Sequence, residues 1–424
     1  MKILLVGAGA REHALATSLS TDPTVSELHA APGNPGIAKL ATQHDVDANS
    51  PQEVSQLALD LGVDLVIIGP EAPLVAGVGD AVRNCGIPVF GPSKAAAELE
   101  GSKAFAKDVM AAANVPTGQA RVCLTIADVE AAIAEFGAPY VVKDDGLAAG
   151  KGVVVTNDRD EALNHAVKCF SKPGGRIVVE EFLDGPEVSV FCLTDGESVI
   201  ALEPAQDFKR AYDGDEGPNT GGMGAYSPLP WAPTDLVDTV VEQVAQPTVD
   251  EMRRRGKPFV GVLYCGLALT SKGPRVIEFN ARFGDPETQA VLARLETPLA
   301  KVFQAAATGT IDRVPPLQWR EVCAVNVVIA SEGYPVSASG RREILGLETV
   351  AGRADVQVLH AGTCLGDPDS SDVPLEALLC NGGRVLSVIG TGASLSAARD
   401  AAYEAVDAIT LEGSHHRRDI AAGM

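Results

Sequence analysis

The sequence predicts a multidomain protein that combines α/β and α+β domains. Its 424 residues correspond to about three domains at roughly 150 residues each. Strands that are apolar throughout alternate with helices near the N-terminus, which indicates a parallel sheet covered on both faces. The order of elements then changes, and a small α+β unit within residues 102–190 interrupts a larger domain. We therefore expect domains at 1–101, 102–320 and 321–424.

The N-terminal domain is predicted from short apolar runs and one clear helix start. Residues 3–6 form a first buried strand, and a helix follows from about residue 11. Residues 50–53 (Ser-Pro-Gln-Glu) match a capping box with proline at the first helical position. Two further buried strands are expected at 63–69 and 87–90.

The remaining elements follow from the same kind of pattern. Helices are expected from residue 125 to near 137, around 163–170, at 234–255 and near 394–409, and strands at 140–143, 152–156, 177–182, 188–193 and in a hairpin at 259–280. Between about 203 and 230 the chain is rich in Gly, Pro, Asp and Asn, which predicts a long loop without regular structure.

Composition excludes several classes of function. With 34 Lys and Arg against 56 Asp and Glu, the formal charge is −22, which argues against nucleic-acid binding through phosphate neutralisation. No apolar run approaches the roughly 18 residues of a membrane span. The eight cysteines are scattered without a Cys-x-x-Cys pair, as expected of reduced cysteines in a cytoplasmic protein.

A glycine-containing turn, Gly7-Ala8-Gly9-Ala10-Arg11-Glu12, follows the first strand. Such glycines let the backbone approach a phosphate, and the helix that follows offers N–H donors. However, Glu12 stands where the dinucleotide-binding fingerprint has its third glycine, and the next strand ends at 31–34 without an acidic residue. Phosphate binding and simple packing of strand on helix both remain open for this turn.

A second glycine-rich segment runs from Asp145 to Gly152, shortly after Lys143. It is not a P-loop, because Asp145 replaces the first glycine and Gly152 replaces the Ser or Thr that binds magnesium. A flexible loop between antiparallel strands, with a lysine at each end, suits a lid over polyphosphate. The alternative is a hairpin loop with solvated lysines.

The strand predicted at 177–182 ends in charged residues, and Glu187 follows. Strand alternation places Glu180 and Glu181 on opposite faces. The backbone N–H and C=O groups of this segment can form hydrogen bonds with the edge of an adenine, and the Glu187 carboxylate can accept hydrogen bonds from ribose hydroxyls. An ordinary strand that ends in charge explains the same pattern equally well.

Glu278 and Asn280 lie two residues apart on a predicted strand and therefore project to the same face. A carboxylate and an amide oxygen aimed together suit a hard cation such as Mg²⁺. Arg282, Asp285 and Glu287 follow directly, and such groups beside apolar residues are costly to bury without a ligand. The alternative is a solvated hairpin end.

A glycine-dense turn occupies residues 217–228. Its central residues are Asn219, Thr220, Gly221, Gly222, Met223 and Gly224. Such a turn presents backbone N–H groups as an anion-binding surface, with a flexible loop as the alternative. The preceding Lys209 and Arg210 add positive charge.

In combination, these segments resemble the phosphoribosylamine–glycine ligase family of the ATP-grasp superfamily, over essentially the whole chain. The matching segments are 9–14, 69–74, 101–105, 145–152, 217–228 and 282–288. The last is specific to this family, whereas the glycine-rich loop alone indicates only an ATP-grasp enzyme. The resemblance implies a Rossmann-like pre-ATP-grasp N-terminal domain, an ATP-grasp body with a mobile lid at about 119–188, and a small C-terminal domain.

The resemblance also implies the residues of each site. Those for ATP are Lys103, Lys143, Gly146, Gly150, Lys151, Gly152, Glu180, Glu181, Phe182, Leu183 and Glu187. Those for Mg²⁺ or Mn²⁺ are Glu278 and Asn280. Those for the substrates are Gly9, Arg11, Glu12, Gly69, Pro70, Glu71 and residues 219–224. Those for catalysis are Arg282, Asp285 and Glu287.

The implied reaction is the ATP-dependent ligation of glycine to 5-phosphoribosylamine through a glycyl phosphate, a step of de novo purine biosynthesis. It gives glycinamide ribonucleotide, ADP and phosphate. Glycine and 5-phosphoribosylamine are then the expected partners, with no nucleic acid, no membrane and no obligate protein partner. Which of Lys209, Arg210 and Arg282 binds the glycine carboxylate, and which the ribose phosphate, stays open.

Three other functions were weighed. Another ATP-grasp carboxylate–amine ligase or carboxylase would share the lid and the metal pair but not the 217–228 and 282–288 segments together. An NAD-dependent oxidoreductase lacks the third glycine and the ribose acid. A catalytically inactive binding module does not need the phosphate lysines and metal ligands that are present here.

Two positions depart from the family pattern. Asp144 stands where alanine is common, and its side chain is expected to point away from Lys143 with little effect on ATP. Phe208 stands where histidine is frequent.

Overall fold

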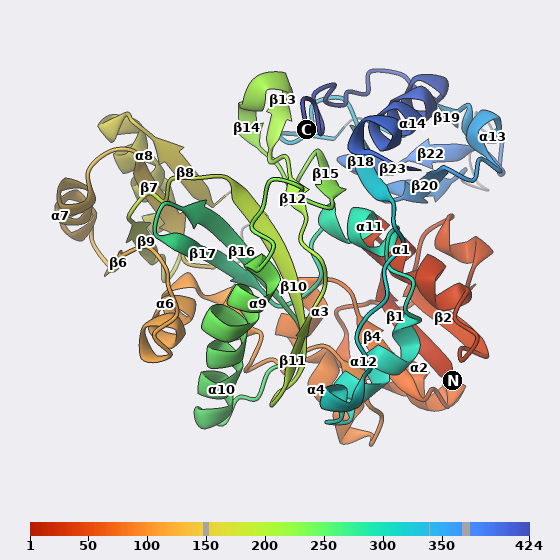
Figure 1. The fold of residues 1–424 in the computed structure, drawn as a ribbon, viewed down its shortest axis with the longest axis horizontal. Helices are drawn as coiled ribbons and strands as arrows, with labels where there is room; N and C mark the ends of the chain where they lie inside the picture. The colour runs from red at the N-terminus through yellow and green to blue at the C-terminus, as the bar shows by residue number, and fades with distance from the viewer. Residues whose placement is uncertain (147–151, 339, 367–373) are drawn as a thin grey trace.

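The fold is described from a computed structural model, which places residues 1–146, 152–338, 340–366 and 374–424. Three regions of the chain follow one another from red to blue in Figure 1, with the lid projecting from the body on the left. Within the described ranges, no helix has the length and apolar character needed to span a membrane. All eight cysteines are free thiols.

The N-terminal domain contains one five-stranded parallel sheet, in the order β3-β2-β1-β4-β5. Its elements are β1 (Lys2–Gly7), α1 (Ala10–Ser20), β2 (Glu27–Pro32), the 3₁₀ turn η1 (Ile37–Lys39), β3 (Thr42–Gln43), α2 (Pro51–Leu61), β4 (Leu65–Ile68), α3 (Glu71–Ala76), α4 (Val78–Asn84) and β5 (Val89–Phe90). The predicted start of α2 is confirmed, because the Ser50 hydroxyl accepts a hydrogen bond from the Glu53 N–H at 3.3 Å. The central strands are buried throughout, as their unbroken apolar runs predicted.

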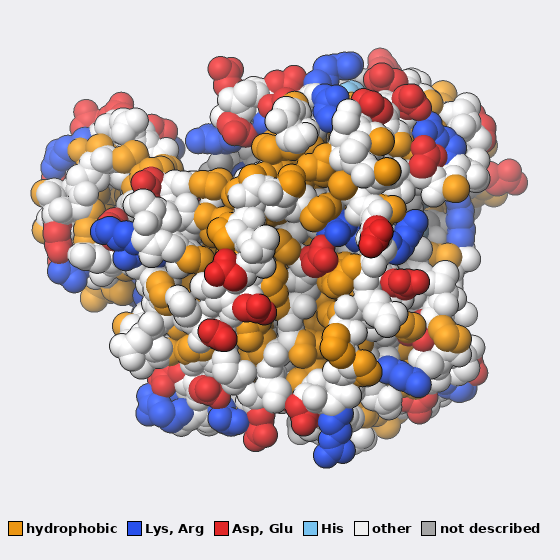
Figure 2. All heavy atoms as spheres, viewed as in Figure 1, with side chains coloured by type: hydrophobic (Ala, Val, Ile, Leu, Met, Phe, Trp, Pro, Cys, Tyr) orange, Lys and Arg blue, Asp and Glu red, His pale blue; other side chains and the backbone are white. Residues whose placement is uncertain are grey.

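The lid is a small α+β unit with its own sheet and its own core. After α5 (Glu98–Gly101) and α6 (Lys103–Ala112) come β6 (Ala120–Cys123), α7 (Ile126–Phe136), β7 (Tyr140–Asp144), β8 (Val153–Thr156), α8 (Arg159–Phe170) and β9 (Ile177–Glu180). The antiparallel sheet has the order β6-β9-β7-β8. Its apolar cluster is separate from the two clusters of the rest of the protein, and the lid forms a distinct lobe in the space-filling view (Figure 2).

The central body is built on a four-stranded antiparallel sheet, in the order β11-β10-β16-β17. The strands are β10 (Glu187–Asp195), β11 (Val199–Ala201), β16 (Val260–Thr270) and β17 (Gly273–Asn280). The predicted helix at 234–255 consists of α9 (Leu236–Val240), a π-helical turn η3 (Val241–Ala245) and α10 (Gln246–Arg254). Two more helices, α11 (Glu287–Leu292) and α12 (Leu299–Ala307), and a 3₁₀ turn η4 (Ile311–Arg313) lead out of the body.

The C-terminal sheet begins before the C-terminal region of the sequence. Its order is β12-β15-β18-β23-β20, and its first two strands are β12 (Gln206–Asp207) and β15 (Gly224–Ser227). The prediction that 203–230 is a long loop without regular structure is therefore wrong, since it also contains β13 (Arg210–Tyr212), the turn η2 (Asp213–Asp215) and β14 (Glu216–Asn219). The remaining elements are β18 (Cys323–Ala330), β19 (Ile344–Leu345), α13 (Leu347–Val350), β20 (Val356–His360), β21 (Thr363–Leu365), β22 (Leu378–Cys380), β23 (Arg384–Gly392), α14 (Leu395–Ala408) and β24 (Thr410–Leu411).

Candidate active site

Glu12 fills the space at the carboxyl ends of the first and fourth strands. Its carboxylate accepts hydrogen bonds from the Gly9 N–H at 2.7 Å and from Arg11 Nε at 2.6 Å. A Cβ atom on Gly69 would lie 2.1 Å from Glu12 Oε1, and one on Gly7 would lie 2.6 Å from Glu12 Cγ. The glycines of this turn therefore make room for a buried carboxylate of the protein itself.

Arg11 and Arg282 join the N-terminal domain to the body. Arg11 Nη1 donates to the carbonyl of Phe283 at 2.9 Å, while Arg282 lies 3.3 Å from Glu71 and 3.1 Å from Glu100. Burial raises the pKa of Glu100, an effect that Arg282 only partly offsets. Burial alone would also raise the pKa of Glu71, but Arg282 and Arg11 hold it below its ordinary value.

Pro70 immediately precedes α3 in extended conformation, and Glu71 is the first residue of that helix. The predicted substrate residues Gly9, Arg11, Glu12, Gly69, Pro70 and Glu71 thus come together at one edge of the parallel sheet. Two of them are carboxylates, so this edge suits hydroxyl and amine donors better than it suits a phosphate.

The glycine-dense turn does not expose its backbone N–H groups, and the expectation that it forms an anion-binding surface is wrong. The N–H groups of Thr220, Gly221 and Met223 donate to the Lys209 carbonyl, the Tyr334 hydroxyl and the Phe208 carbonyl at 2.8, 3.0 and 2.7 Å. The Gly222 N–H donates within the turn, to the Thr220 hydroxyl at 2.9 Å. Met223 is fully buried. The glycines serve close packing instead, since a Cβ on Gly222 would lie 2.3 Å from Pro286 and one on Gly224 2.6 Å from the Asn326 carbonyl.

Asp285 lies against that turn and is held by two side chains that the sequence did not indicate. Gln289 Nε2 donates to Asp285 Oδ1 at 2.9 Å, and Arg384 Nη1 lies 3.4 Å from the same oxygen. Burial alone would raise the pKa of Asp285, but Arg384 and Arg11 hold it below its ordinary value. Asp285 is therefore a buried carboxylate kept in its charged form.

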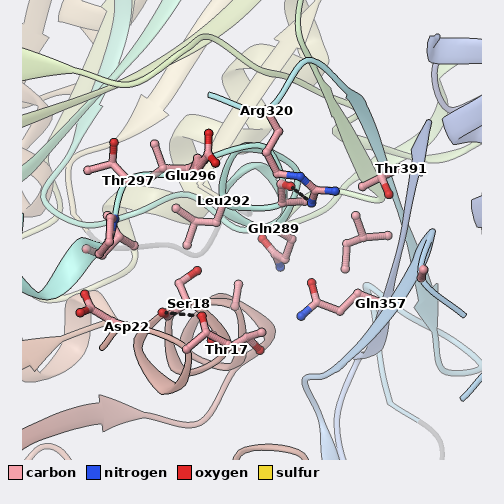
Figure 3. Close-up of a pocket in the computed structure, with 18 of the residues that line it drawn as sticks. Thr17, Ser18, Asp22, Gln289, Leu292, Glu296, Thr297, Arg320, Gln357 and Thr391 are labelled. Carbon is pink, nitrogen blue, oxygen red and sulfur yellow. Dashed lines mark hydrogen bonds between the residues drawn. The ribbon is translucent and has the colours of Figure 1, made fainter. Parts of the chain in front are cut away.

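Gln289 also belongs to the wall of a cavity of about 440 Å³. The cavity lies between α1, α11 and the strands β20 and β23, where residues of all three regions of the chain meet (Figure 3). Among the described residues, none that was predicted to bind nucleotide, metal or substrate lines it. Gln289 connects this cavity to the candidate site, because its side chain donates to Asp285.

Two lysines hold one buried carboxylate at the end of β9. Glu180, at the end of β9, lies 3.1 Å from Lys143 on β7 and 2.8 Å from Lys107 on α6. Burial alone would raise the pKa of Glu180, but the two ammonium groups hold it below its ordinary value. Lys143 Nζ also donates to the carbonyl of Ile277 at 3.1 Å, which brings it beside β17. Lys107 was not predicted, although it lies four residues after Lys103 and hence on the same face of α6.

The start of α6 holds the start of the glycine-rich loop. Lys103 Nζ donates to the carbonyl of Gly146 at 3.0 Å, and Asp145 accepts from the Ala104 N–H at 3.1 Å. Asp145 also pairs with Arg176. Gly152 is buried at the start of the next strand, and the predicted Gly150 and Lys151 lie outside the described residues.

The neighbouring residue Asp144 points away from Lys143, as predicted. Its carboxylate pairs with Lys172 rather than with Lys143. Phe208, the second departure, lies beneath the guanidinium group of Arg417, whose Cζ is 4.9 Å from the ring centroid. Both departures are therefore accommodated by local partners.

The segment after β9 leaves main-chain groups available. Glu181 Oε2 accepts from the Gln119 N–H at 3.1 Å, and the Glu181 N–H donates to the Gln119 carbonyl at 2.9 Å. Phe182 is 44% exposed. Within the described ranges, the main-chain groups of Phe182 and Leu183 have no hydrogen-bond partner, so they are free to meet the edge of a base.

Glu187 begins β10 and is paired with Lys209. The Lys209 ammonium lies 2.5 Å from Glu187 and 2.8 Å from Asp207. Lys209 lowers the pKa of Glu187. Burial raises the pKa of Asp207, and Lys209 offsets this rise only in part. The nearby carboxylates of Glu187 and Glu278 raise the pKa further.

Glu278 and Asn280 lie on β17 opposite Gly266 and Tyr264 of β16. Within the described ranges, neither side chain has a hydrogen-bond or ion-pair partner. No group of three or more His, Cys, Asp and Glu side chains suited to a metal was found among the described residues. A carboxylate and an amide oxygen on one strand nevertheless fit Mg²⁺, which is usually bound by one or two protein carboxylates together with substrate phosphates.

Glu287 is buried at the start of α11. Its Oε1 accepts from the Tyr264 hydroxyl at 2.8 Å and from the Ser189 hydroxyl at 3.2 Å. Burial is the main cause that raises the pKa of Glu287 to about 7, and repulsion from Asp207 adds to it. Attraction to Lys209 lowers the pKa but does not cancel these effects. The proton on Glu287 is therefore exchangeable near neutral pH.

This arrangement defines a class of protein. A parallel N-terminal domain, a small lid with lysines facing a buried acid, and a Glu-x-Asn pair on the adjoining antiparallel sheet together identify an ATP-grasp ligase. The comparisons with known proteins agree with this class. Family models match residues 1–100 (phosphoribosylglycinamide synthetase, N domain), 101–288 (its ATP-grasp domain) and 324–423 (its C domain).

Curated relatives and solved structures make the identity specific. The chain is 64% identical to the phosphoribosylamine–glycine ligase of Streptomyces coelicolor, over 100% of this chain and 99% of the relative. It is 54% identical to that of Leifsonia xyli, over 100% of both chains. The crystal structure of the Thermotoga maritima phosphoribosylamine–glycine ligase has a TM-score of 0.84 and 31% identity, over 99% of this chain and 100% of that chain.

A biotin carboxylase domain from Hydrogenobacter thermophilus shares only the fold, with a TM-score of 0.69 at 18% identity over 98% of this chain and 91% of that one. The chain belongs to the phosphoribosylglycinamide synthetase family. It is an ATP-dependent ligase of purine biosynthesis, and its ATP-grasp domain implies the use of ATP and a divalent metal.

Proposed function

We propose that this protein joins glycine to 5-phosphoribosylamine in two steps at one site. ATP first transfers its γ-phosphoryl group to the glycine carboxylate, which gives glycyl phosphate and ADP. The amine of phosphoribosylamine then attacks the carbonyl carbon, phosphate leaves, and glycinamide ribonucleotide forms. The family membership supports this reaction over that of another ATP-grasp ligase or carboxylase.

The observation that carries the proposal is the position of Lys143. Its ammonium group contacts Glu180 and the carbonyl of Ile277, the residue that precedes Glu278. A cation beside a candidate metal ligand is the arrangement that a triphosphate requires. We assign Lys143 and Lys103 to the phosphates of ATP, residues 180–183 to the adenine, and Glu187 to the ribose.

Glu278 and Asn280 would hold the divalent cation, Mg²⁺ or Mn²⁺. Bound there, the cation would neutralise charge on the phosphates during phosphoryl transfer. The absence of hydrogen-bond and ion-pair partners for both side chains among the described residues supports this role. The remaining charge would be balanced by Lys143 and Lys103.

On the other side of the site, carboxylates would receive the second substrate. Glu12 and Glu71 suit the amine and hydroxyl groups of phosphoribosylamine, with Gly9, Gly69 and Pro70 shaping the edge of the sheet. Arg282, Asp285 and Glu287 lie between the two substrate regions and are assigned to catalysis. The raised pKa of Glu287 suits a group that takes up a proton from an attacking amine.

The lid would protect the acyl phosphate from water. Its glycine-rich loop begins at Gly146, which Lys103 holds from α6. Closure over the nucleotide would exclude water from an intermediate that it would otherwise hydrolyse. Gly150, Lys151 and Gly152 are assigned to this loop.

The experiment is phosphate release from ATP with Mg²⁺ and glycine, with phosphoribosylamine generated from ribose 5-phosphate and ammonia. Release that requires both partners, with one amide product per ADP, supports the proposal. Release that ignores phosphoribosylamine but responds to another amine or to bicarbonate would transfer the function to another ATP-grasp reaction. Repeating the assay with Mn²⁺ in place of Mg²⁺ distinguishes the two metals.

We further propose that the protein acts in the cytoplasm without an obligate protein partner. The eight free thiols support a reducing compartment.

A further inference from the structure

Arg384 is the first residue of β23 in the C-terminal sheet, yet its hydrogen bonds go to two loops of other regions. Its Nη1 donates to the carbonyls of Gly221 at 2.7 Å, Gly222 at 3.2 Å and Asp285 at 2.6 Å. The same nitrogen lies 3.4 Å from the Asp285 carboxylate. One cationic group thus binds both the glycine-dense turn and the candidate catalytic loop and holds them together.

The turn leaves little room for a side chain at Gly221 and none at Gly222. A Cβ atom on Gly221 would lie 3.1 Å from the guanidinium carbon of Arg384, and one on Gly222 would lie 2.3 Å from Pro286. The turn is therefore packed closely against both the guanidinium group and the loop 285–286.

The C-terminal region also binds this turn and this loop through two further side chains. The Tyr334 hydroxyl accepts from the Gly221 N–H at 3.0 Å, and Asn326 Nδ2 donates to the Pro286 carbonyl at 2.9 Å. Among the described residues, Arg384 alone donates side-chain hydrogen bonds to both the turn and the loop.

Carbonyl groups that converge on one point repel each other unless a cation lies between them. Arginine supplies a permanent charge and N–H donors in fixed directions. Without this group, the carbonyls of Gly221, Gly222 and Asp285 would separate, and the Asp285 side chain would lose a cation that holds its pKa down.

We propose that Arg384 is a positioning residue for the ligation reaction, which fixes the turn 219–224 against Asp285 and so shapes the glycine and phosphoribosylamine side of the site. This proposal rests on the proposed function. Among the described residues, no hydrogen bond or ion pair of the Arg384 side chain reaches a residue assigned to ATP. The C-terminal domain therefore affects the acceptor side of the site without affecting nucleotide binding.

The test compares Arg384→Ala and Arg384→Lys with wild type. The matched control is Arg342→Ala, because Arg342 bonds only within the C-terminal region, to Glu332 at 2.7 Å and to the Glu412 carbonyl at 3.2 Å. The measurements are KM for glycine and for phosphoribosylamine, the Kd of ATP in the absence of both, and hydrogen exchange followed in peptides that cover 219–224 and β23.

We expect Arg384→Ala to raise at least one acceptor-side KM by tenfold or more while the Kd of ATP stays within twofold. Exchange should accelerate in 219–224 while β23 remains protected, Arg384→Lys should recover part of the loss, and Arg342→Ala should resemble wild type. Unchanged KM values with unchanged exchange would overturn the proposal. So would a loss of protection throughout β18 and β23 that is accompanied by weaker ATP binding, because that is a purely structural effect.

The proposed function can fail separately. If the wild-type protein forms no product from glycine and phosphoribosylamine, the assigned reaction is wrong. In that case the exchange pattern in 219–224 and β23 still decides whether Arg384 positions the turn.

Discussion

The ammonium group of Lys143 lies 3.1 Å from the carboxylate of Glu180, and both side chains are almost completely buried. Lys107 contacts the same carboxylate from α6 at 2.8 Å. Two cations therefore share this carboxylate. Lys143 also contacts the carbonyl of Ile277, the residue before Glu278, so its ammonium group does not serve Glu180 alone.

Lys143→Met should weaken ATP binding much more than it weakens folding. Glu180 keeps Lys107, so we expect a stability loss of only about 1 kcal/mol, whereas removal of a phosphate contact should raise the Kd of ATP by at least about tenfold. Titration calorimetry and urea unfolding measure the two effects. Lys172→Met is the control, since Lys172 pairs with the adjacent Asp144 and is largely exposed; equal ATP affinity in both variants would contradict the assignment.

Glu278→Gln should abolish metal-dependent turnover while the fold is retained. The side chain has no partner among the described residues, so its replacement breaks no internal bond. Loss of a charged ligand should lower kcat by roughly 10²-fold or more, because the phosphoryl charge is no longer neutralised. The rate is measured against Mg²⁺ concentration, with the exposed Glu296→Gln as control. Near-normal rates at low Mg²⁺ would place the metal elsewhere.

Gly69→Ala should damage the phosphoribosylamine side alone. The new methyl group would lie 2.1 Å from Glu12 Oε1 and would displace the carboxylate from Gly9 and Arg11. We expect a higher KM for phosphoribosylamine with an unchanged Kd of ATP. Gly101→Ala is the control, because a Cβ there meets nothing within 4 Å. If both variants behave alike, Glu12 does not contribute to this substrate.

Glu287→Gln should change how stability depends on pH. The folded state raises the pKa of Glu287 from 4.5 to about 7, so it binds the proton more tightly than the unfolded chain. The wild type should therefore lose up to ~3 kcal/mol from this group as pH rises from about 4.5 to 7, and the glutamine variant should not. The difference in unfolding free energy between the two proteins is measured across this range, and a difference independent of pH would contradict the shift.

Much of the fold was predictable because its signals are local. The apolar runs of β1 and β4 and the N-cap of α2 each depend on a few adjacent residues, and all three are confirmed. The capping box itself is not closed, because the Glu53 carboxylate accepts from the Asp47 N–H and not from the Ser50 N–H. The strands within 206–227 could not be predicted in this way. They are two to four residues long, and β15 pairs with β18, a hundred residues farther along the chain.

In the candidate site too, some residues could be predicted from local sequence signals and others could not. Glu278 and Asn280 were recognisable from strand alternation, and Lys143 from its place beside a glycine-rich loop. Arg384 gave no such signal, because its acceptors are main-chain carbonyls 99 and 163 residues away in sequence. The wrong expectation for the 219–224 turn has a related cause. A high glycine content shows that other atoms can approach the backbone closely, but it does not show whether those atoms belong to a ligand or to the protein itself.

The carboxylate of Glu12 has a consequence for what the N-terminal domain excludes. In related parallel-sheet domains the N–H groups of this turn receive the pyrophosphate of a dinucleotide, but here the Gly9 N–H already has an anion as partner. A dinucleotide would have to displace a negative charge that is covalently part of the domain and that Arg11 also holds. The domain thus has the fold of a dinucleotide-binding domain, but its own Glu12 carboxylate occupies the position that the pyrophosphate of a dinucleotide would take.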